Sequence, residues 1–307
     1  MAADRVLVVG ALHWDRVVRA PRLPRRDETL VGSGIEEVFG GKGGNQAVAA
    51  ALHGASVAMA GRVGDDPAAV QLLGFLDRAG VARGQVQQGK GPSGTSVAIV
   101  DEKGDYGAVI VSAANLEIDA QAIAVPPETA LVLLQNEVPE AVNLAVARAA
   151  RAAGAKLLLN AAPVRPTSEE LLSLVDLLIV NRTEAAMLAG QEIADRAAAS
   201  AVAARLARDG RGALVTLGAE GLVYSGPEGE IARPAFAVEV VSTHGAGDAF
   251  VGALAARLAA PKTAGGAFAP ALDYAQAAAA LGLSRPPGER LSITPAAVER
   301  LLQSTRR

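Results

Sequence analysis

Short runs of β-branched and aliphatic residues alternate with longer Ala-rich segments along most of this chain. The Ala-rich segments have the apolar spacing of amphipathic helices, and several end at a glycine, which readily adopts the left-handed conformation that follows a helix. This alternation is typical of a parallel sheet covered by helices on both faces. We predict strands at residues 6–10, 57–60, 131–135, 156–160, 177–180, 213–217 and 236–241, and helices at residues 45–53, 67–79, 139–153, 183–188, 197–209, 247–258, 270–283 and 295–301.

Two segments interrupt this alternation. Residues 16–38 show no helical pattern, and residues 95–112 have the pattern of a hairpin that turns at residues 101–104. Two β-rich insertions in an α/β chain predict a small separate sheet, which would cover a site on the main sheet. We therefore expect a single domain over residues 1–307, with a lid formed by about residues 16–38 and 95–112.

The composition indicates how the core is filled. Half of the 307 residues are apolar but only 3% are aromatic, so Ala, Val and Leu must supply most of the buried volume. Small side chains let helices pack close to a sheet, which suits a layered α/β fold.

Charge and cysteine content narrow the class of protein. The net charge is −3, and the densest basic cluster, at Arg22, Arg25 and Arg26, is interpreted as a solvated loop, so no nucleic-acid partner is expected. The absence of cysteine excludes disulfides, thiol nucleophiles and Cys-ligated zinc, and it fits a reducing compartment. No stretch reaches the roughly 18 apolar residues of a membrane span. We therefore expect a cytoplasmic protein with no membrane partner.

Two glycine motifs match nucleotide-binding patterns but lack the required context. Residues 84–91 resemble a phosphate-binding P-loop, yet Gly91 stands where a Ser or Thr hydroxyl is needed. Residues 89–94 match the dinucleotide fingerprint GxGxxG but lead into a strand-like run instead of a helix. Both are interpreted as loop glycines. The three histidines, His13, His53 and His244, lie far apart in sequence, so a catalytic zinc site is not expected.

The strongest chemical signal is the segment Ser-Thr-His-Gly-Ala-Gly-Asp at residues 242–248. A Gly-Ala-Gly turn opens a helix here, so the N–H groups of Gly245, Ala246, Gly247 and Asp248 would be unpaired and able to bind an anion. A carboxylate at such a position can accept a hydroxyl proton while the N–H groups stabilise a transferring phosphoryl group. The alternative is that Asp248 is an ordinary helix N-cap.

A second signal lies at residues 39–47, where four glycines within five residues precede an amphipathic helix. Glycines allow the backbone to approach a polar ligand closely, and Lys42 and Asn45 would act as hydrogen-bond donors. The alternative is a flexible loop.

These two segments together resemble the signatures of the ribokinase family, also called the phosphofructokinase B family. The resemblance extends from Val6 to the last helix, and the form GGKGGNQAVAA is especially similar to the ribokinase branch. It implies a three-layer α/β/α sandwich with a mainly parallel central sheet and a small β-sheet lid. It also implies phosphoryl transfer from MgATP to a sugar hydroxyl, and a homodimer that pairs through the lids.

The resemblance implies a role for individual residues. Asp248 would be the catalytic base, with an anion hole formed by Gly245, Ala246 and Gly247. The residues implied to bind the sugar are His13, Asp15, Gly41, Lys42, Gly43, Asn45, Glu137 and Asp248. Those implied to bind the nucleotide are Asn181, Thr216, Gly218, Gly221, Gly247 and Gln276, and Glu184 would hold Mg²⁺ through water.

Two positions depart from the family pattern. His13 stands where ribokinases usually have Asn, which leaves open whether ribose is the acceptor. Ser242 stands where the family commonly has an Asp that helps to bind a monovalent cation, so weak or absent activation by K⁺ is expected.

Three functions stay open from the sequence. The first is phosphorylation of the primary hydroxyl of a pentose such as ribose. The second is a nucleoside kinase, although only Trp14 stands near the substrate motif to stack on a base. The third is a non-catalytic sugar-binding or regulatory protein. The presence of both Asp248 and the glycine turn argues against this third function.

Overall fold

The computed structural model describes residues 5–102, 106–242, 245–260, 267–285 and 293–305. Within these residues, nine strands form a large sheet in the order β13-β12-β11-β10-β9-β8-β1-β4-β5. All neighbours pair in parallel except β11–β12 and β12–β13. The strands are β1 (Arg5–Val9), β4 (Ser56–Val63), β5 (Ala82–Gln88), β8 (Thr129–Gln135), β9 (Lys156–Asn160), β10 (Leu177–Asn181), β11 (Gly212–Thr216), β12 (Leu222–Gly226) and β13 (Gly229–Arg233).

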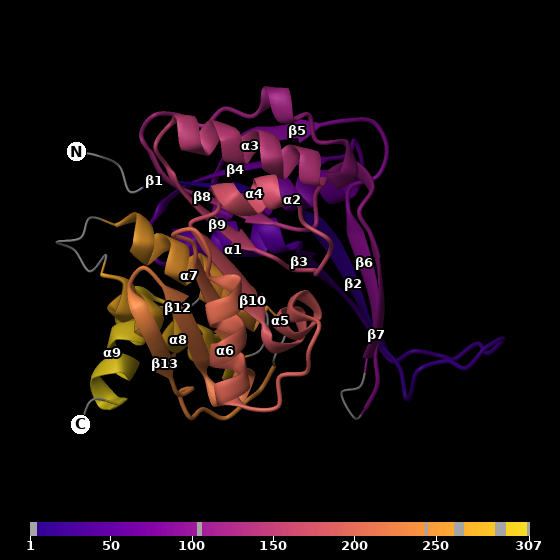
Figure 1. Cartoon of the computed structure of the whole chain (residues 1–307). Helices are drawn as coiled ribbons and strands as arrows, with labels where there is room; N and C mark the ends of the chain where they lie inside the picture. The colour runs from indigo at the N-terminus through magenta and orange to yellow at the C-terminus, as the bar shows by residue number, and fades with distance from the viewer. Residues whose placement is uncertain (1–4, 103–105, 243–244, 261–266, 286–292, 306–307) are drawn as a thin grey trace.

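Helices cover both faces of the large sheet, as Figure 1 shows. Alternate residues of β1 explain this arrangement, because Val6 and Val8 pack with one set of helices and Leu7 and Val9 with the other. The first set is α1 (Lys42–Leu52), α2 (Pro67–Arg78), α7 (Ala246–Ala259), α8 (Phe268–Leu283) and α9 (Pro295–Thr305). The second set is α3 (Glu140–Ala152), α4 (Glu169–Leu174), α5 (Arg182–Ala189) and α6 (Arg196–Leu206). The predicted three-layer α/β/α architecture is confirmed.

The two β-rich insertions meet in a separate small sheet of the order β3-β2-β6-β7. Its strands are β2 (His13–Arg19), β3 (Gly34–Gly40), β6 (Thr95–Val100) and β7 (Tyr106–Val111). Only residues 10–12 separate β1 from β2, and only Gly41 separates β3 from α1. The small sheet therefore begins directly at the edge of the large sheet where β1 ends.

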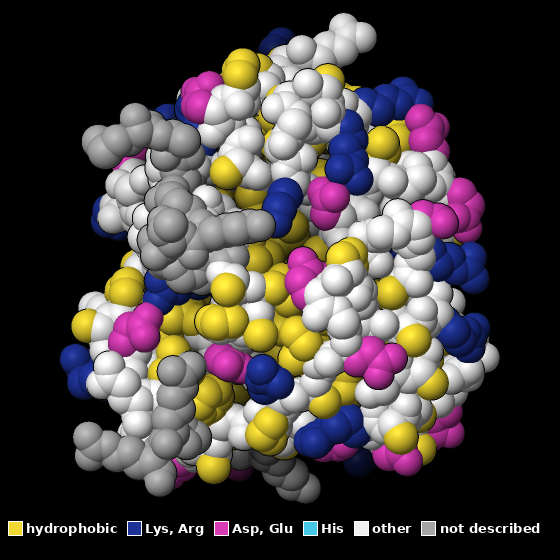
Figure 2. Space-filling model, turned by 60° about the vertical axis from the view of Figure 1, so that its left-hand side comes forward, with side chains coloured by type: hydrophobic (Ala, Val, Ile, Leu, Met, Phe, Trp, Pro, Cys, Tyr) yellow, Lys and Arg dark blue, Asp and Glu magenta, His cyan; other side chains and the backbone are white. Residues whose placement is uncertain are grey.

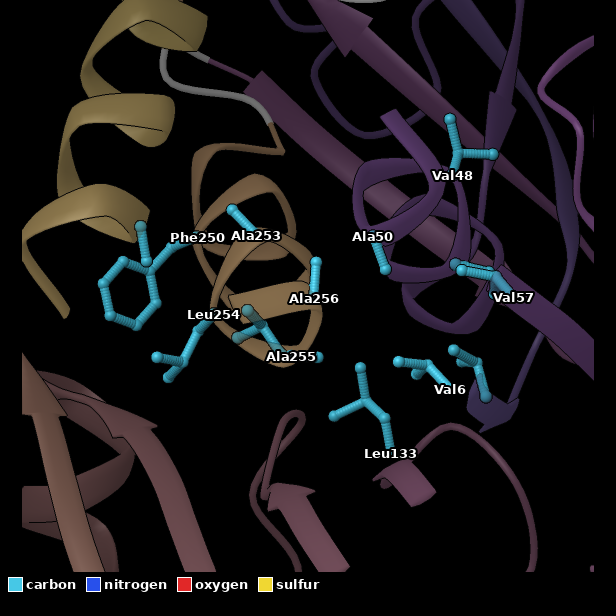
Figure 3. Packing of buried hydrophobic residues seen from close by; sticks show 14 of the residues in the cluster. Val6, Val48, Ala50, Val57, Leu133, Phe250, Ala253, Leu254, Ala255 and Ala256 are labelled. Carbon is cyan, nitrogen blue, oxygen red and sulfur yellow. The ribbon is translucent and has the colours of Figure 1, made fainter. Parts of the chain in front are cut away.

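Helices α1 and α7 pack unusually closely because small residues line their contact. A Cβ atom added at Gly252 of α7 would lie 2.5 Å from both the carbonyl oxygen of Gln46 and Cβ of Ala49 on α1. Figure 3 shows Ala256 of α7 on the side toward Ala50 of α1, above Val6 and Leu133 of the sheet. This contact fixes the N-terminal ends of the two helices relative to each other.

One predicted element is wrong and several were not predicted. Residues 236–241 have an alternating pattern but form no strand, since the N–H of Val241 donates to Leu283 O at the end of α8. Strands β2, β3, β5, β12 and β13 and helix α4 had not been predicted as separate elements.

Figure 2 shows the molecular surface in a view turned so that the left-hand side of Figure 1 faces the reader. Hydrophobic side chains gather in the middle of this face, and charged side chains of both signs are interspersed around them. Among the described residues, no helix is both long enough and apolar enough to cross a bilayer.

Candidate active site

The C-terminal ends of the parallel strands surround a cavity of about 70 Å³. The carboxyl ends of adjacent parallel strands share one edge of a sheet, which is where ligands bind in open α/β folds. Six of the residues lining the cavity are among those predicted from the sequence: Lys42, Asn181, Glu184, Thr216, Gly247 and Asp248. The two glycine segments, which are about 200 residues apart in sequence, therefore meet at one site.

Asp248 lies in the first turn of α7 and is 8% exposed. The N-cap of this helix is Gly245, with φ of 71°, so the interpretation of Asp248 as an N-cap is wrong. Its carboxylate instead accepts hydrogen bonds from Nε2 of Gln46 at 2.9 Å and from Nδ2 of Asn45 at 3.3 Å. The catalytic candidate is thus tied to α1 by two side chains.

The first turn of α7 is open to a ligand at Gly247. A Cβ atom added to Gly247 would meet nothing within 4 Å, although this residue lines the cavity. The N–H groups of a first helical turn have no acceptor within their own helix. The space beside Gly247 is therefore suited to a group with negative charge.

Lys42, the first residue of α1, lies next to Glu137, which follows β8. The backbone N–H of Lys42 donates to Oε2 of Glu137 at 2.7 Å. Burial raises the pKa of Glu137 to about 7, although the Lys42 N–H and charge act in the opposite direction. Burial by itself would lower the pKa of Lys42, but the carboxylates of Asp248, Glu137 and Glu184 outweigh it, so this pKa is raised and the ammonium form is favoured. The cavity lining thus contains a cationic Lys42 together with Asp248 and Glu184, and Glu137 lies next to Lys42.

Close backbone contacts at α1 explain the glycines of this segment. Gly41 is the N-cap with φ of 84°, and a Cβ there would lie 2.5 Å from Ala11 O. A Cβ at Gly43 would lie 2.7 Å from the carbonyl carbon of Gly10. These glycines hold an ordered helix start against the end of β1, so the interpretation as a flexible loop is wrong.

The small sheet places Asp15 and His13 beside this group. Oδ1 of Asp15 accepts a 2.8 Å hydrogen bond from Ser96 N, which joins β2 to β6. His13 is 2% exposed, and its Nε2 has no hydrogen-bond partner among the described residues. Burial lowers the pKa of His13 in spite of the nearby Asp15 charge, so the neutral imidazole is favoured.

Asn181 and Glu184 form a capping box at the start of α5. Oδ1 of Asn181 accepts from Glu184 N at 2.8 Å, and Oε2 of Glu184 accepts from Asn181 N at 2.9 Å. Burial raises the pKa of Glu184. Glu184 is therefore a first-turn helix acid and also lines the cavity. No cluster of three acids or histidines suited to direct metal ligation occurs among the described residues.

The remaining predicted nucleotide residues lie outside the cavity lining. Gly218 and Gly221 flank the turn after β11 with φ of 60° and 96°, and a Cβ at Gly221 would lie 1.9 Å from Arg233 O. Nε2 of Gln276 on α8 donates to Pro234 O at 3.4 Å. Ser242 N donates to Leu283 O at 3.1 Å. His244 and residues 286–292 lie outside the described residues.

Three buried amides were missed by sequence reasoning. Gln46 and Gln135 are 0% exposed and Asn160 is 7% exposed, and hydrogen bonds connect all three to Asp248. The only local signal was the position of Gln46 directly after Asn45. Its partners are far away in sequence, so their contact is visible only in the fold.

The two misleading glycine motifs run from within strand β5 into the turn before β6, and none of their residues lines the cavity. Gly91 N donates to Oδ1 of Asp65 at 2.8 Å, and Ser93 N donates to Oδ2 of Asp66 at 2.9 Å. The segment leads into strand β6. The interpretation as loop glycines is confirmed for Gly89, Gly91 and Gly94, whereas Gly84 lies within strand β5 and that part of the prediction is wrong.

Known proteins of similar sequence and structure define the class. The model of the pfkB family of carbohydrate kinases matches residues 3–290. A ribokinase from Bacillus subtilis (strain 168) is 34% identical over 282 residues, which cover 91% of this chain and 92% of that protein. A ribokinase from Mus musculus is 34% identical over 266 residues, covering 84% and 82%. The chain therefore belongs to the pfkB family of carbohydrate kinases, as predicted.

Solved structures agree with this assignment. The structure of Arabidopsis thaliana ribokinase complexed with ribose and ATP has a TM-score of 0.87 and 29% identity, and the match covers 98% of this chain and 99% of that chain. Ribokinase from Cryptococcus neoformans in complex with ADP has a TM-score of 0.79 and 28% identity, covering 96% and 99%.

Proposed function

We propose that this carbohydrate kinase transfers the terminal phosphoryl group of ATP to the primary hydroxyl of ribose or a related pentose. The observation that carries this proposal is the buried Asp248 carboxylate next to the open first turn of α7, in a cavity that also contains Lys42. The ribose and ATP bound to the Arabidopsis ribokinase support the choice of substrates.

Each reacting group has a counterpart in the site. The acceptor hydroxyl loses its proton to Asp248 while its oxygen bonds to the terminal phosphorus and ADP leaves. The N–H groups of the turn at residues 245–247 stabilise the negative charge on the transferring group, and Lys42 adds a positive charge on the same side. Asp15, Asn45 and Glu137 would hold the sugar hydroxyls.

The nucleotide would lie along the ends of β10 and β11. Thr216 lines the cavity, and Gly218 and Gly221 in the turn after β11, with Gln276 on α8, are candidates to hold the base and ribose of ATP. Asn181 and Glu184 would hold Mg²⁺ through water, which fits the absence of a direct metal cluster among the described residues. Since Ser242 supplies a neutral hydroxyl where the family commonly has Asp, we propose that K⁺ activates weakly or not at all.

We also propose that the small sheet acts as a lid and joins two copies of the chain in a cytoplasmic homodimer. Its strands expose hydrophobic side chains at Ile35, Val97, Val109, Ile110 and Val111. Val97 and Val109 lie directly opposite each other on β6 and β7, so they form a continuous apolar surface. Exposed apolar patches of this kind mark interaction sites.

One set of assays on the purified enzyme can test both the identity of the phosphoryl acceptor and the role of Asp248 as the base. ADP release is measured with ribose, other pentoses, hexoses and nucleosides for the wild type and Asp248→Asn. We expect ribose or a related pentose to give the highest kcat/KM, and Asp248→Asn to lower kcat by about 10²- to 10⁴-fold with little change in ATP binding. Turnover of Asp248→Asn within a few-fold of wild type would remove Asp248 from the mechanism, and a nucleoside as best acceptor would replace the sugar.

A further inference from the structure

A chain of buried amides ends on the carboxylate of Asp248. Nε2 of Gln135 donates to Oε1 of Gln46 at 2.8 Å. Nε2 of Gln46 then donates to two acceptors, Oδ1 of Asn160 and Oδ1 of Asp248, both at 2.9 Å. Gln46 thus uses both of its N–H bonds and its carbonyl oxygen within the protein.

The orientation of the Gln46 amide is fixed by its neighbours. Nδ2 of Asn160 donates to Ile179 O at 3.2 Å, which turns Oδ1 of Asn160 toward Gln46. If the Gln46 amide were flipped, its oxygen would face the oxygens of Asn160 and Asp248, and its NH₂ group would face the NH₂ group of Gln135. All three contacts would become repulsive. The amide therefore presents a donor to Asp248 in every favourable arrangement.

The two oxygens of Asp248 are held differently. Oδ1 receives the buried Gln46 donor at 2.9 Å, whereas among the described residues Oδ2 receives the half-buried Asn45 at 3.3 Å. A hydrogen bond in low-dielectric surroundings is stronger than one near water, so Oδ1 is the anchored atom. Oδ2 is left as the oxygen that faces an incoming hydroxyl.

We propose that Gln46 is a positioning residue that anchors Oδ1 of Asp248 and leaves Oδ2 to receive the proton of the acceptor hydroxyl. Gln135 and Asn160 act one step farther away, because they fix the direction of the Gln46 amide. The proposal rests on the proposed role of Asp248 as the base, and it assigns no contact between Gln46 and substrate.

The test replaces the donor without changing the packing volume greatly. Gln46→Met removes the amide but has a similar length and shape. We expect kcat to fall roughly 10- to 100-fold, as for a misplaced catalytic group, while the KM values for sugar and ATP stay within about threefold. The charges of Lys42, Glu137 and Glu184 around Asp248 remain in this variant, so a change in the pH dependence of kcat reports on the lost donor. The acid limb of the profile should move to higher pH, since a hydrogen bond to the charged form is lost.

A double variant separates positioning from simple structural support. In an Asp248→Asn background, Gln46→Met should cause little further loss of kcat, because Gln46 acts through the Asp248 carboxylate. Asn143→Leu is the matched control: Asn143 is also fully buried, and its amide donates to Gln135 O outside the chain of side chains. It should lower thermal stability without changing the pH profile.

Three results decide the matter. A wild-type kcat and pH profile in Gln46→Met, with Asp248→Asn inactive, would overturn the proposal while leaving the base in place. Full turnover in Asp248→Asn would instead end the proposed role of Asp248 itself. If Gln46→Met does not fold, Gln135→Met serves in its place, because it removes the donor that holds Oε1 of Gln46. A smaller loss of kcat and a smaller shift of the pH profile in the same direction support the proposal, and an unchanged profile overturns it.

Discussion

The backbone N–H of Lys42 and the carboxyl of Glu137 are joined by a 2.7 Å hydrogen bond across 95 residues of sequence. This bond connects the start of α1 to the segment after β8. Because burial raises the pKa of Glu137 to about 7, this carboxyl group changes its charge close to neutral pH. Sugar binding and the free energy of unfolding should therefore both depend on pH in this range.

The first prediction concerns the pH dependence of sugar binding. Above a pH of about 7 Glu137 is mostly a carboxylate, which in its proposed role would accept hydrogen bonds from sugar hydroxyls, whereas below that pH the group is mostly protonated. We expect the sugar KM to fall as the pH rises from about 6 to 8, and Glu137→Gln to remove this dependence. Steady-state kinetics across this range provide the check, and an equally steep profile in Glu137→Gln would point to another group.

Ionisation of Glu137 should favour sugar binding but lower the free energy of unfolding as the pH rises. Its pKa in the folded state is raised, so its stabilising contribution is fully present below the ordinary Glu pKa of about 4.3 and is lost as the pH rises to about 7. The free energy of unfolding of the wild type should therefore decline relative to that of Glu137→Gln over this interval. Denaturant unfolding of both proteins at several pH values measures the difference, and a constant difference would contradict a raised pKa.

The second prediction separates the sugar side from the nucleotide side. Asp15 lies on the small sheet, whereas Thr216 lies at the end of β11. A charge-assisted hydrogen bond contributes about 1.5–3 kcal/mol, so Asp15→Ala should raise the sugar KM about tenfold or more and leave the ATP KM nearly unchanged. Asp15→Asn is the control, because its amide oxygen can still accept from Ser96 N and preserve the sheet. Equal rises in both KM values would place Asp15 outside the sugar site.

The third prediction concerns acceptor preference at His13. The imidazole is buried, has an unpaired Nε2 among the described residues, and favours the neutral form. His13→Asn supplies a smaller group that both donates and accepts, so we expect the ribose KM to fall. A panel of pentoses assayed in parallel shows whether the change is specific. Loss of ribose activity would mean that the pocket is built around the imidazole and that another acceptor should be sought.

The fourth prediction tests the close contact of α1 and α7. A methyl group at Gly252 would meet the Gln46 carbonyl at 2.5 Å, so Gly252→Ala should cost about 1–3 kcal/mol in the free energy of unfolding and lower kcat as well. Gly282→Ala in α8 is the matched control, since its nearest neighbour would be Ile293 Cδ1 at 3.8 Å. That change should be neutral or stabilising by up to about 1 kcal/mol. Equal stability of the two variants would show that the helices can move apart freely.

Much of the fold could be predicted because buried parallel strands are continuous apolar runs. Two of the strands that were missed are polar or exposed: β5 has the sequence ARGQVQQ, and β3 is mostly exposed before Val38. Strand β12 was missed although Leu222, Val223 and Tyr224 are buried, because its apolar run is only three residues long. Residues 236–241 show the opposite failure, because an alternating pattern predicts a strand only where a neighbouring strand is available to pair with it. Sequence alone does not show that neighbour.

The site could be predicted as far as its residues share a local motif. Glycines next to Lys42 and Asp248 signal close backbone approach within a few positions of the chain. The role of Gln46 depends instead on Asn160 and Asp248, which are 114 and 202 residues away. A buried amide leaves no periodic or spacing signal, so only the assembled fold shows which donor it presents.

The short connections from β1 to β2 and from β3 to α1 join two parts of the molecule, the small sheet and the main α/β/α body, and the proposed site draws residues from both. His13 and Asp15 belong to the small sheet, whereas Asp248 and Gln46 belong to the tightly packed pair α1 and α7 in the main body. With the roles proposed above, substitutions on β2 should alter which sugar is accepted without disturbing Asp248 and Gln46. New acceptor specificities can arise in this scaffold through changes in a few small-sheet residues, whether by natural divergence or by directed evolution.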